Sequence, residues 1–188
     1  MNLPNKLTIL RIILVPVFLV LFNLNLYWIA GIVFVIASLT DLADGKIARK
    51  YNLVTNFGKF ADPLADKLLV SAALIALCAT GKLGAPLLGM WATFIIIARE
   101  FMVTGVRLVA AAEGKVIAAG MSGKIKTTIQ MITIIYILFA DVLVNIFKLP
   151  VFISDIVVNV LVVASVFMTV YSGAEYLIQN KTLLNTNK

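Results

Sequence analysis

Four aspartates lie close together in a chain that is otherwise strongly apolar on both sides of them: Asp41, Asp44, Asp62 and Asp66. Carboxylates next to hydrocarbon are costly, so an acidic group of this kind predicts a functional site. If both flanks are helical, each pair of aspartates shares one helix face. Four convergent carboxylates repel one another unless cations lie between them, and a site made only of oxygen ligands suits Mg²⁺ or Mn²⁺. The alternative is that these aspartates cap helix ends or pair with nearby lysines and arginines.

The elements that must position these carboxylates follow from the composition. The 188 residues are 62% hydrophobic, with a mean hydropathy of +1.05, which is too apolar for one soluble core. We therefore predict an all-α integral membrane protein, a bundle of six transmembrane helices with a polar cavity open to the cytoplasm. Residues 1–188 form one predicted domain. The first predicted helix lies within residues 1–24, with Pro4 near its start and an apolar run over residues 7–21, and is a retained helix rather than a signal peptide. The other five cover about residues 26–50, 60–79, 86–112, 124–146 and 152–178.

The segments between these helices are short and polar. Residues 51–59 are a predicted link between the two halves of the acidic motif, residues 80–84 a glycine-containing turn, and residues 113–123 a loop. Each half of the motif therefore lies at a helix end, next to the link.

The basic residues indicate the orientation. With six spans, fourteen of the sixteen lysines and arginines fall on one side, and the positive-inside rule places both termini and the acidic motif on the cytoplasmic side of the cell membrane. The net charge of +7 lies mainly beside apolar spans, which favours anionic lipids and a phosphate-bearing substrate over nucleic acid. The sequence has no histidine, so carboxylates are the natural proton acceptors.

The acidic stretch also carries a family resemblance. From residue 41 to residue 66 it fills every fixed position of the pattern Asp-x2-Asp-Gly-x2-Ala-Arg-x8-Gly-x3-Asp-x3-Asp, and it resembles the signature of the CDP-alcohol phosphotransferases. The resemblance implies that Asp41, Asp44 and Asp62 ligate divalent metal, Mg²⁺ or Mn²⁺, as two ions. It also implies that Asp66 touches a metal and takes the proton from the attacking hydroxyl.

Further residues of the motif are expected to bind CDP-diacylglycerol. Gly45 and Ala48 are small where the family gives space to the cytidine, although Gly45 alone could equally serve helix packing. Arg49 lies one turn beyond Gly45 and could reach a phosphate, or could extend to the membrane surface. By resemblance, Thr55 contacts the nucleotide lipid and Gly58 allows a tight entry into the next helix.

The resemblance extends outside the motif. The opening Pro4-Asn5-x-Leu7-Thr8-x-x-Arg11 is similar to the branch of the family that uses sn-glycerol 3-phosphate, which implies that Asn5 and Thr8 line the CDP-diacylglycerol site. Four later cations could converge on the dianionic phosphate of the acceptor, or could form a basic band facing lipid headgroups. These are Arg99, Arg107, Lys124 and Lys126.

The expected activity is transfer of a phosphatidyl group from CDP-diacylglycerol to sn-glycerol 3-phosphate, releasing CMP. The same chemistry with inositol phosphate or serine as acceptor is the nearest alternative. An ion-coupled transporter would have no need of Gly45, Ala48 or Arg49, and a prenyltransferase fits the aspartate spacing poorly. By resemblance we expect a homodimer among membrane lipids.

Overall fold

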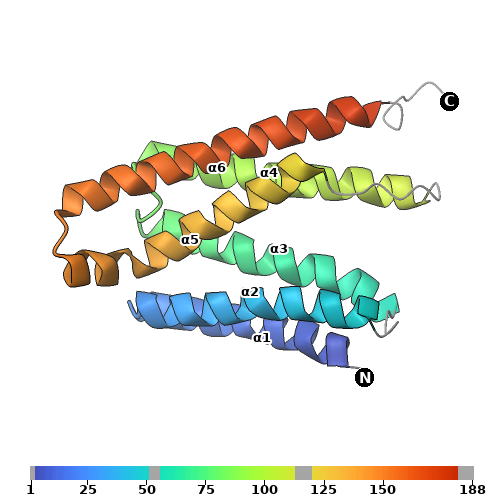
Figure 1. Ribbon diagram of the computed structural model, residues 1–188, viewed down its shortest axis with the longest axis horizontal. Helices are drawn as coiled ribbons and strands as arrows, with labels where there is room; N and C mark the ends of the chain where they lie inside the picture. Colours follow the sequence, from blue (N-terminus) through green and yellow to red (C-terminus); the bar gives the residue numbers. More distant parts are fainter. Residues whose placement is uncertain (1–2, 51–55, 113–119, 182–188) are drawn as a thin grey trace. The chain divides into compact units, whose positions relative to one another are not determined.

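The computed structural model describes the backbone of residues 3–50, 56–112 and 120–181, and the side chains there except those of residues 3, 4, 42–50, 56–60, 63 and 112. Within these ranges the chain is all-helical apart from short connections, as predicted, and forms six helices (Figure 1). They are α1 (Leu3–Asn23), α2 (Tyr27–Lys50), α3 (Asn56–Ala79), α4 (Pro86–Ala112), α5 (Met121–Phe147) and α6 (Val151–Gln179). The chain divides into two compact units, with α5 split between them at Thr133.

The first unit comprises residues 1–80 and 134–150. In it α1 packs against both α2 and α3 (Figure 1). Small buried side chains let the helix backbones approach closely, as is usual in membrane proteins; they are Ala30, Ala37, Ala61, Ala65 and Ala73. This packing sets α1 directly against the two helices that carry the acidic motif.

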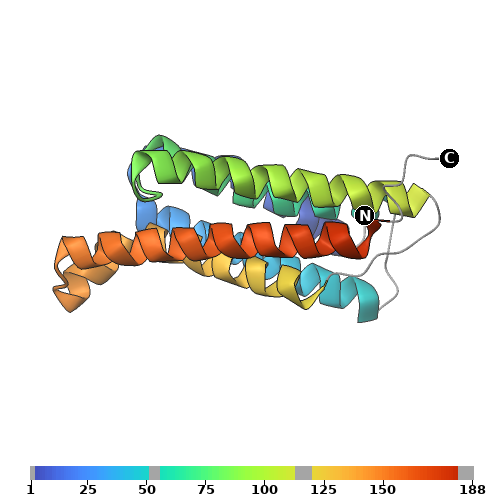
Figure 2. The same ribbon diagram turned by 90° about the horizontal axis from the view of Figure 1, so that it is seen from above.

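The second unit comprises residues 81–133 and 151–188. Its helices α4 and α6 pack together and run in the same direction (Figure 2). The interior is partly polar, because the Thr133 and Ser165 hydroxyls pair at 2.9 Å. At one end Gly84 adopts a φ of +83°, which glycine allows at no steric cost, and the next amide, of Ala85, donates to Asn159 of α6. The start of α4 is thereby tied to α6.

Among the residues that the structure describes, three helical segments are long and apolar enough to cross a membrane: Asn5–Asn23, Met121–Phe147 and Val151–Gln179. A shorter apolar helical stretch, Tyr27–Asp41, leads into the acidic motif. The chain is therefore a membrane protein by length and composition, and the crossing of all six helices stays a prediction.

Two predicted boundaries are wrong. Helix α3 begins at Asn56 rather than near residue 60, so the link between the motif halves is shorter than predicted and Gly58 lies inside the first turn of the helix. Asparagine is favoured at helix starts, which explains why the helix begins there. The sequence predicts a link instead because the polar residues at this position lack apolar periodicity. Helix α5 likewise begins at Met121, where the Lys124 amide closes the first turn on the Gly120 carbonyl.

Candidate active site

The acidic motif lies on two helices, as its spacing predicts. Helix α2 carries Asp41 and Asp44 three residues apart, and α3 carries Asp62 and Asp66 four residues apart. Because both backbones are continuous helix, each pair shares a face. The side chain of Asp44 lies outside the described residues, and those of the other three aspartates are described.

Asp41 is paired with a deeply buried arginine from α1. The Arg11 Nη1 atom lies 2.7 Å from Asp41 Oδ1, and the Arg11 side chain is 0% exposed whereas that of Asp41 is 39% exposed. A guanidinium in such a place needs a charged partner, because an unpaired buried charge is very costly. The buried Arg11 therefore orients the Asp41 carboxylate, and much of the Asp41 side chain stays accessible.

Asp62 is also supported by α1. The Thr8 hydroxyl, which is fully buried, donates to Asp62 Oδ1. Asn5 is buried one turn earlier on the same helix, and Asp66 is exposed one turn beyond Asp62 on α3. Helix α1 thus contacts one carboxylate of each motif half. Its Arg11 pairs with Asp41 of α2, and its Thr8 donates to Asp62 of α3.

The remaining residues expected to bind CDP-diacylglycerol belong to the less fully described part of the chain. Gly45, Ala48 and Arg49 lie on α2 and Gly58 lies on α3, and the side chains there are outside the described residues. Thr55 lies outside the described residues altogether. The assignment of all five to the nucleotide lipid stays a prediction.

The donor set suits a hard divalent cation. Aspartate oxygens are the ligand type that Mg²⁺ and Mn²⁺ prefer, and contacts such as those from Arg11 and Thr8 are the kind that orient ligating carboxylates. Among the described side chains no three potential ligands gather into one group, and Asp44 is not among those described. Metal ligation by the four aspartates stays a prediction.

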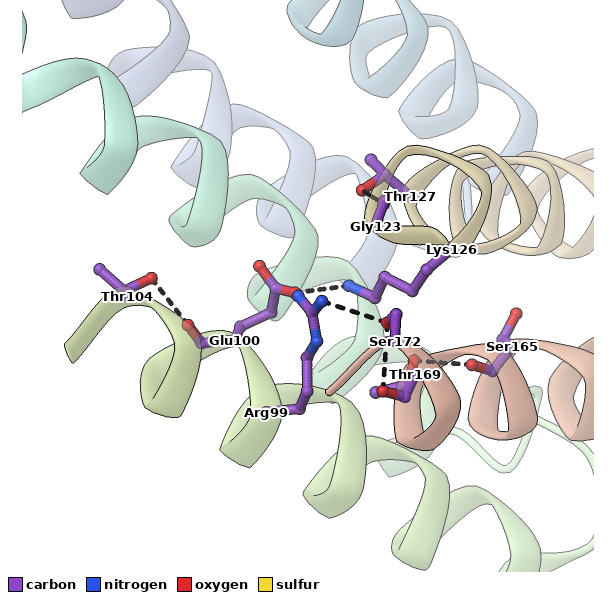
Figure 3. Close-up of polar contacts among 9 residues, drawn as sticks. All are labelled: Arg99, Glu100, Thr104, Gly123, Lys126, Thr127, Ser165, Thr169 and Ser172. Carbon is purple, nitrogen blue, oxygen red and sulfur yellow. Dashed lines mark hydrogen bonds and ion pairs between the residues drawn. The ribbon is translucent and has the colours of Figure 1, made fainter. Parts of the chain in front are cut away.

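The predicted basic residues are arranged around a glutamate. Glu100 Oε1 accepts from Arg99 Nη1 at 2.9 Å and from Lys126 Nζ at 2.6 Å, and Arg99 Nη2 donates to Ser172 Oγ at 3.1 Å. Figure 3 shows these four side chains, which we call the Arg99 cluster, converging from α4, α5 and α6. The side chains are mostly buried, at 13% exposed for Arg99, 20% for Glu100 and 3% for Lys126. The structure therefore brings together Arg99 and Lys126 of the predicted set.

The other two predicted acceptor residues, Arg107 and Lys124, are not joined to this cluster by a hydrogen bond or ion pair among the described side chains. The Arg107 guanidinium is exposed and sits over the Tyr176 ring, 5.6 Å from its centroid. Lys124 is exposed near the start of α5. The structure therefore joins two of the four predicted cations through Glu100, and the convergence of all four on a phosphate stays a prediction.

Three polar contacts were missed from the sequence. Arg11 falls in the opening motif and among the basic residues of one side, and a lone arginine within an apolar helix is itself a signal for a buried partner. From the sequence alone Glu100 could orient Arg99 or merely neutralise it, and in the structure its carboxylate accepts from both Arg99 and Lys126. Ser172 carried no signal, because serines are common in membrane helices.

Replacing Arg11 by glutamine is expected to lower the thermal unfolding midpoint of the purified protein. The substitution leaves Asp41 without its buried counter-charge, and losing a hydrogen bond to a charged group costs about 1.5–3 kcal/mol. The measurement is thermal unfolding in detergent. The matched control is Lys6→Gln, an exposed cation on the same helix, for which little change is expected. Equal midpoints for the two variants would show that the Arg11–Asp41 pair does not stabilise the fold.

The described residues form six helices, and they include segments apolar enough to cross a membrane. Helix α1 contacts the carboxylates of the acidic motif. These features define an all-α membrane protein with a carboxylate site. The chain belongs to the CDP-alcohol phosphatidyltransferase family, whose model matches residues 1–177.

Similar proteins cover almost the whole chain. A Bacillus subtilis protein named CDP-diacylglycerol–glycerol-3-phosphate 3-phosphatidyltransferase is 45% identical over 99% of this chain and 98% of its own. A Rickettsia typhi protein of the same name is 38% identical over 96% of this chain and 98% of its own. A Mycobacterium tuberculosis protein named as a probable phosphatidylglycerophosphate synthase is 38% identical over 93% of this chain and 79% of its own.

Proposed function

We propose that this chain transfers the phosphatidyl group of CDP-diacylglycerol to sn-glycerol 3-phosphate, giving phosphatidylglycerophosphate and CMP. The observation that carries the proposal is its 45% identity, over 99% of its length, to a relative named for that activity. Two features support this proposal, each within its own unit. The first unit offers carboxylates suited to a metal-assisted phosphoryl-type transfer, and the second offers a buried pair of cations suited to a phosphorylated acceptor.

The transfer itself makes one bond and breaks one. An acceptor hydroxyl oxygen attacks the phosphorus that bears diacylglycerol, the bond from that phosphorus to the CMP oxygen breaks, and CMP leaves. The hydroxyl proton passes to a carboxylate, for which we propose Asp66. Its exposure on α3 makes this carboxylate accessible to an acceptor.

The other aspartates would hold the divalent ions that neutralise the charge of the nucleotide lipid. We assign Asp41, Asp44 and Asp62, with Asp66 beside them, to two divalent ions, Mg²⁺ or Mn²⁺, which when bound would neutralise the diphosphate and stabilise the leaving oxygen. Arg11 and Thr8 keep the Asp41 and Asp62 carboxylates oriented. The set proposed to bind CDP-diacylglycerol is Asn5, Thr8, Gly45, Ala48, Arg49, Thr55 and Gly58.

The proposed setting is the cell membrane. Six transmembrane helices would surround a polar cavity open to the cytoplasm, with both termini on the cytoplasmic side, because fourteen of the sixteen lysines and arginines then lie inside. Residues 1–188 would act as one domain, and the active protein would be a homodimer.

The deciding assay uses purified protein, Mg²⁺ or Mn²⁺, CDP-diacylglycerol and a panel of acceptors. We expect CMP release with sn-glycerol 3-phosphate and formation of a phosphorylated phosphatidyl product. Release with serine or inositol phosphate but not with sn-glycerol 3-phosphate would replace the proposed acceptor. Absence of CMP release with every alcohol would contradict the proposed chemistry.

Lys126→Ala and Arg107→Ala are each expected to raise the apparent KM for sn-glycerol 3-phosphate more than that for CDP-diacylglycerol. Both cations are assigned with Arg99 and Lys124 to the acceptor phosphate, and loss of a charged contact weakens binding about tenfold or more. Steady-state kinetics with each substrate varied in turn is the measurement, with Lys181→Ala, an exposed lysine near the end of α6, as the charge-matched control. A larger change in the KM for CDP-diacylglycerol would show that these cations serve the nucleotide lipid instead.

A further inference from the structure

The Arg99 side chain is held from two helices at once. Its Nη1 atom donates to Glu100 on its own helix α4, and its Nη2 atom donates to Ser172 on α6 (Figure 3). A guanidinium has five N–H donors in a rigid planar fork, so two such bonds fix both its position and its plane. The donors not used in these bonds are then presented in one orientation.

Gly173, the residue after Ser172, leaves the space that the Arg99 side chain occupies. A Cβ atom at position 173 would lie 3.1 Å from Arg99 Cγ and 3.8 Å from Arg99 Nε. The first distance is tighter than ordinary van der Waals contact, so a side chain there would require the Arg99 stem to shift by a few tenths of an ångström. The helix conformation does not require glycine at this position, because only Gly81 and Gly84 among the described glycines have positive φ.

Glu100 also binds Lys126, the second cation of the Arg99 cluster. One oxygen, Oε1, accepts from both Arg99 and Lys126, and the Lys126 side chain is nearly fully buried. Two cations this close repel each other in a medium of low dielectric constant, and the shared carboxylate keeps them together. The three side chains sum to one positive charge, which still attracts a dianion.

We propose that Glu100, Ser172 and Gly173 position Arg99 and Lys126 for the phosphate of the acceptor, so that α6 is part of the acceptor site. This inference rests on the proposed function. The three residues act through the two cations. Glu100 holds the Arg99 and Lys126 side chains next to each other, Ser172 fixes the plane of the guanidinium, and Gly173 leaves room for the aliphatic part of Arg99.

The test compares two glycine-to-alanine variants. Gly173→Ala places a methyl group against Arg99, whereas Gly105→Ala on α4 meets nothing within 4 Å and gains the same helix propensity. We expect Gly173→Ala to raise the apparent KM for sn-glycerol 3-phosphate about tenfold, the loss typical of one disturbed charged hydrogen bond, with the KM for CDP-diacylglycerol nearly unchanged. Gly105→Ala should match the wild type. Competitive inhibition by inorganic phosphate should weaken in parallel, because phosphate probes the same contacts without the glycerol.

A double-mutant cycle separates positioning from a general loss of structure. If Gly173 acts through Arg99, Gly173→Ala should have little further effect in an Arg99→Ala background. An equal effect with and without Arg99 would overturn the inference, as would matching KM values for Gly173→Ala and Gly105→Ala. A wild-type protein that does not use sn-glycerol 3-phosphate would instead contradict the proposed function, and this outcome is read before any variant is compared.

Ser172→Ala and Glu100→Gln provide independent variants. Ser172→Ala removes the hydroxyl that accepts from Arg99 Nη2 and should raise the KM for sn-glycerol 3-phosphate. Thr128→Ala removes an exposed hydroxyl that donates to the Lys124 carbonyl of its own helix and should not. Glu100→Gln keeps the shape but loses the charge that holds two cations together, so we expect a larger increase. Unchanged KM values for sn-glycerol 3-phosphate in both variants would contradict a positioning role.

Discussion

Asp41→Asn, Asp44→Asn and Asp62→Asn are each expected to abolish phosphatidyl transfer. Asparagine has nearly the same shape as aspartate but no charge, so each variant weakens the binding of a divalent cation while retaining an oxygen for its protein contact. At Asp41 that contact is Arg11 and at Asp62 it is Thr8, which is why asparagine rather than alanine is the informative replacement.

The measurements are CMP release as a function of Mg²⁺ or Mn²⁺ concentration and the metal-dependent shift of the thermal unfolding midpoint. The second readout reports cation binding without catalysis. Asp155→Asn is the matched control, an exposed aspartate near the start of α6, and it should keep wild-type turnover. Near-normal activity and metal dependence in any motif variant would remove that aspartate from the site.

Asp66→Asn is expected to bind CDP-diacylglycerol and at least one divalent ion while losing most of its turnover. Asp66 shares a face of α3 with Asp62 but is exposed, and the sequence offers no histidine to take the proton. Loss of a general base alone typically lowers the rate ~10²–10⁴-fold. A larger fall would indicate that metal binding is lost as well.

Calorimetry of substrate and metal binding, combined with steady-state rates across pH, separates these roles of Asp66. A base should leave both binding constants close to wild type while the rate falls. Turnover like that of the wild type would exclude Asp66 as the base, and loss of metal binding at normal substrate affinity would make it mainly a ligand.

The fold was largely predictable because apolar runs and their polar interruptions determine where membrane helices form. The prediction is wrong where a helix begins with polar residues: the first turn of α3 at Asn56 carries no apolar periodicity, so the sequence there predicts a link. The spacing of the aspartates predicted which of them share a face, since that depends on the local helix geometry alone.

The contacts between helices could not be predicted in the same way. The pairing of Arg11 with Asp41 depends on how α1 packs against α2, and no local pattern specifies that register. Ser172 and Gly173 are ordinary residues for a membrane helix, and they become significant only because Arg99 of α4 lies against them. The long-range polar contacts of α6 were therefore invisible in the sequence.

The burial of Arg11 also bears on how the chain enters the bilayer during synthesis. Helix α1 emerges from the ribosome before α2, with a charge inside a segment apolar enough to span, and its partner Asp41 emerges only at the end of the next apolar stretch. Hydroxyls such as Thr93, which bonds the Gly89 carbonyl of its own helix, are satisfied as soon as their helix forms, whereas a guanidinium in hydrocarbon is not. The insertion machinery would therefore release α1 and α2 into lipid together as a hairpin.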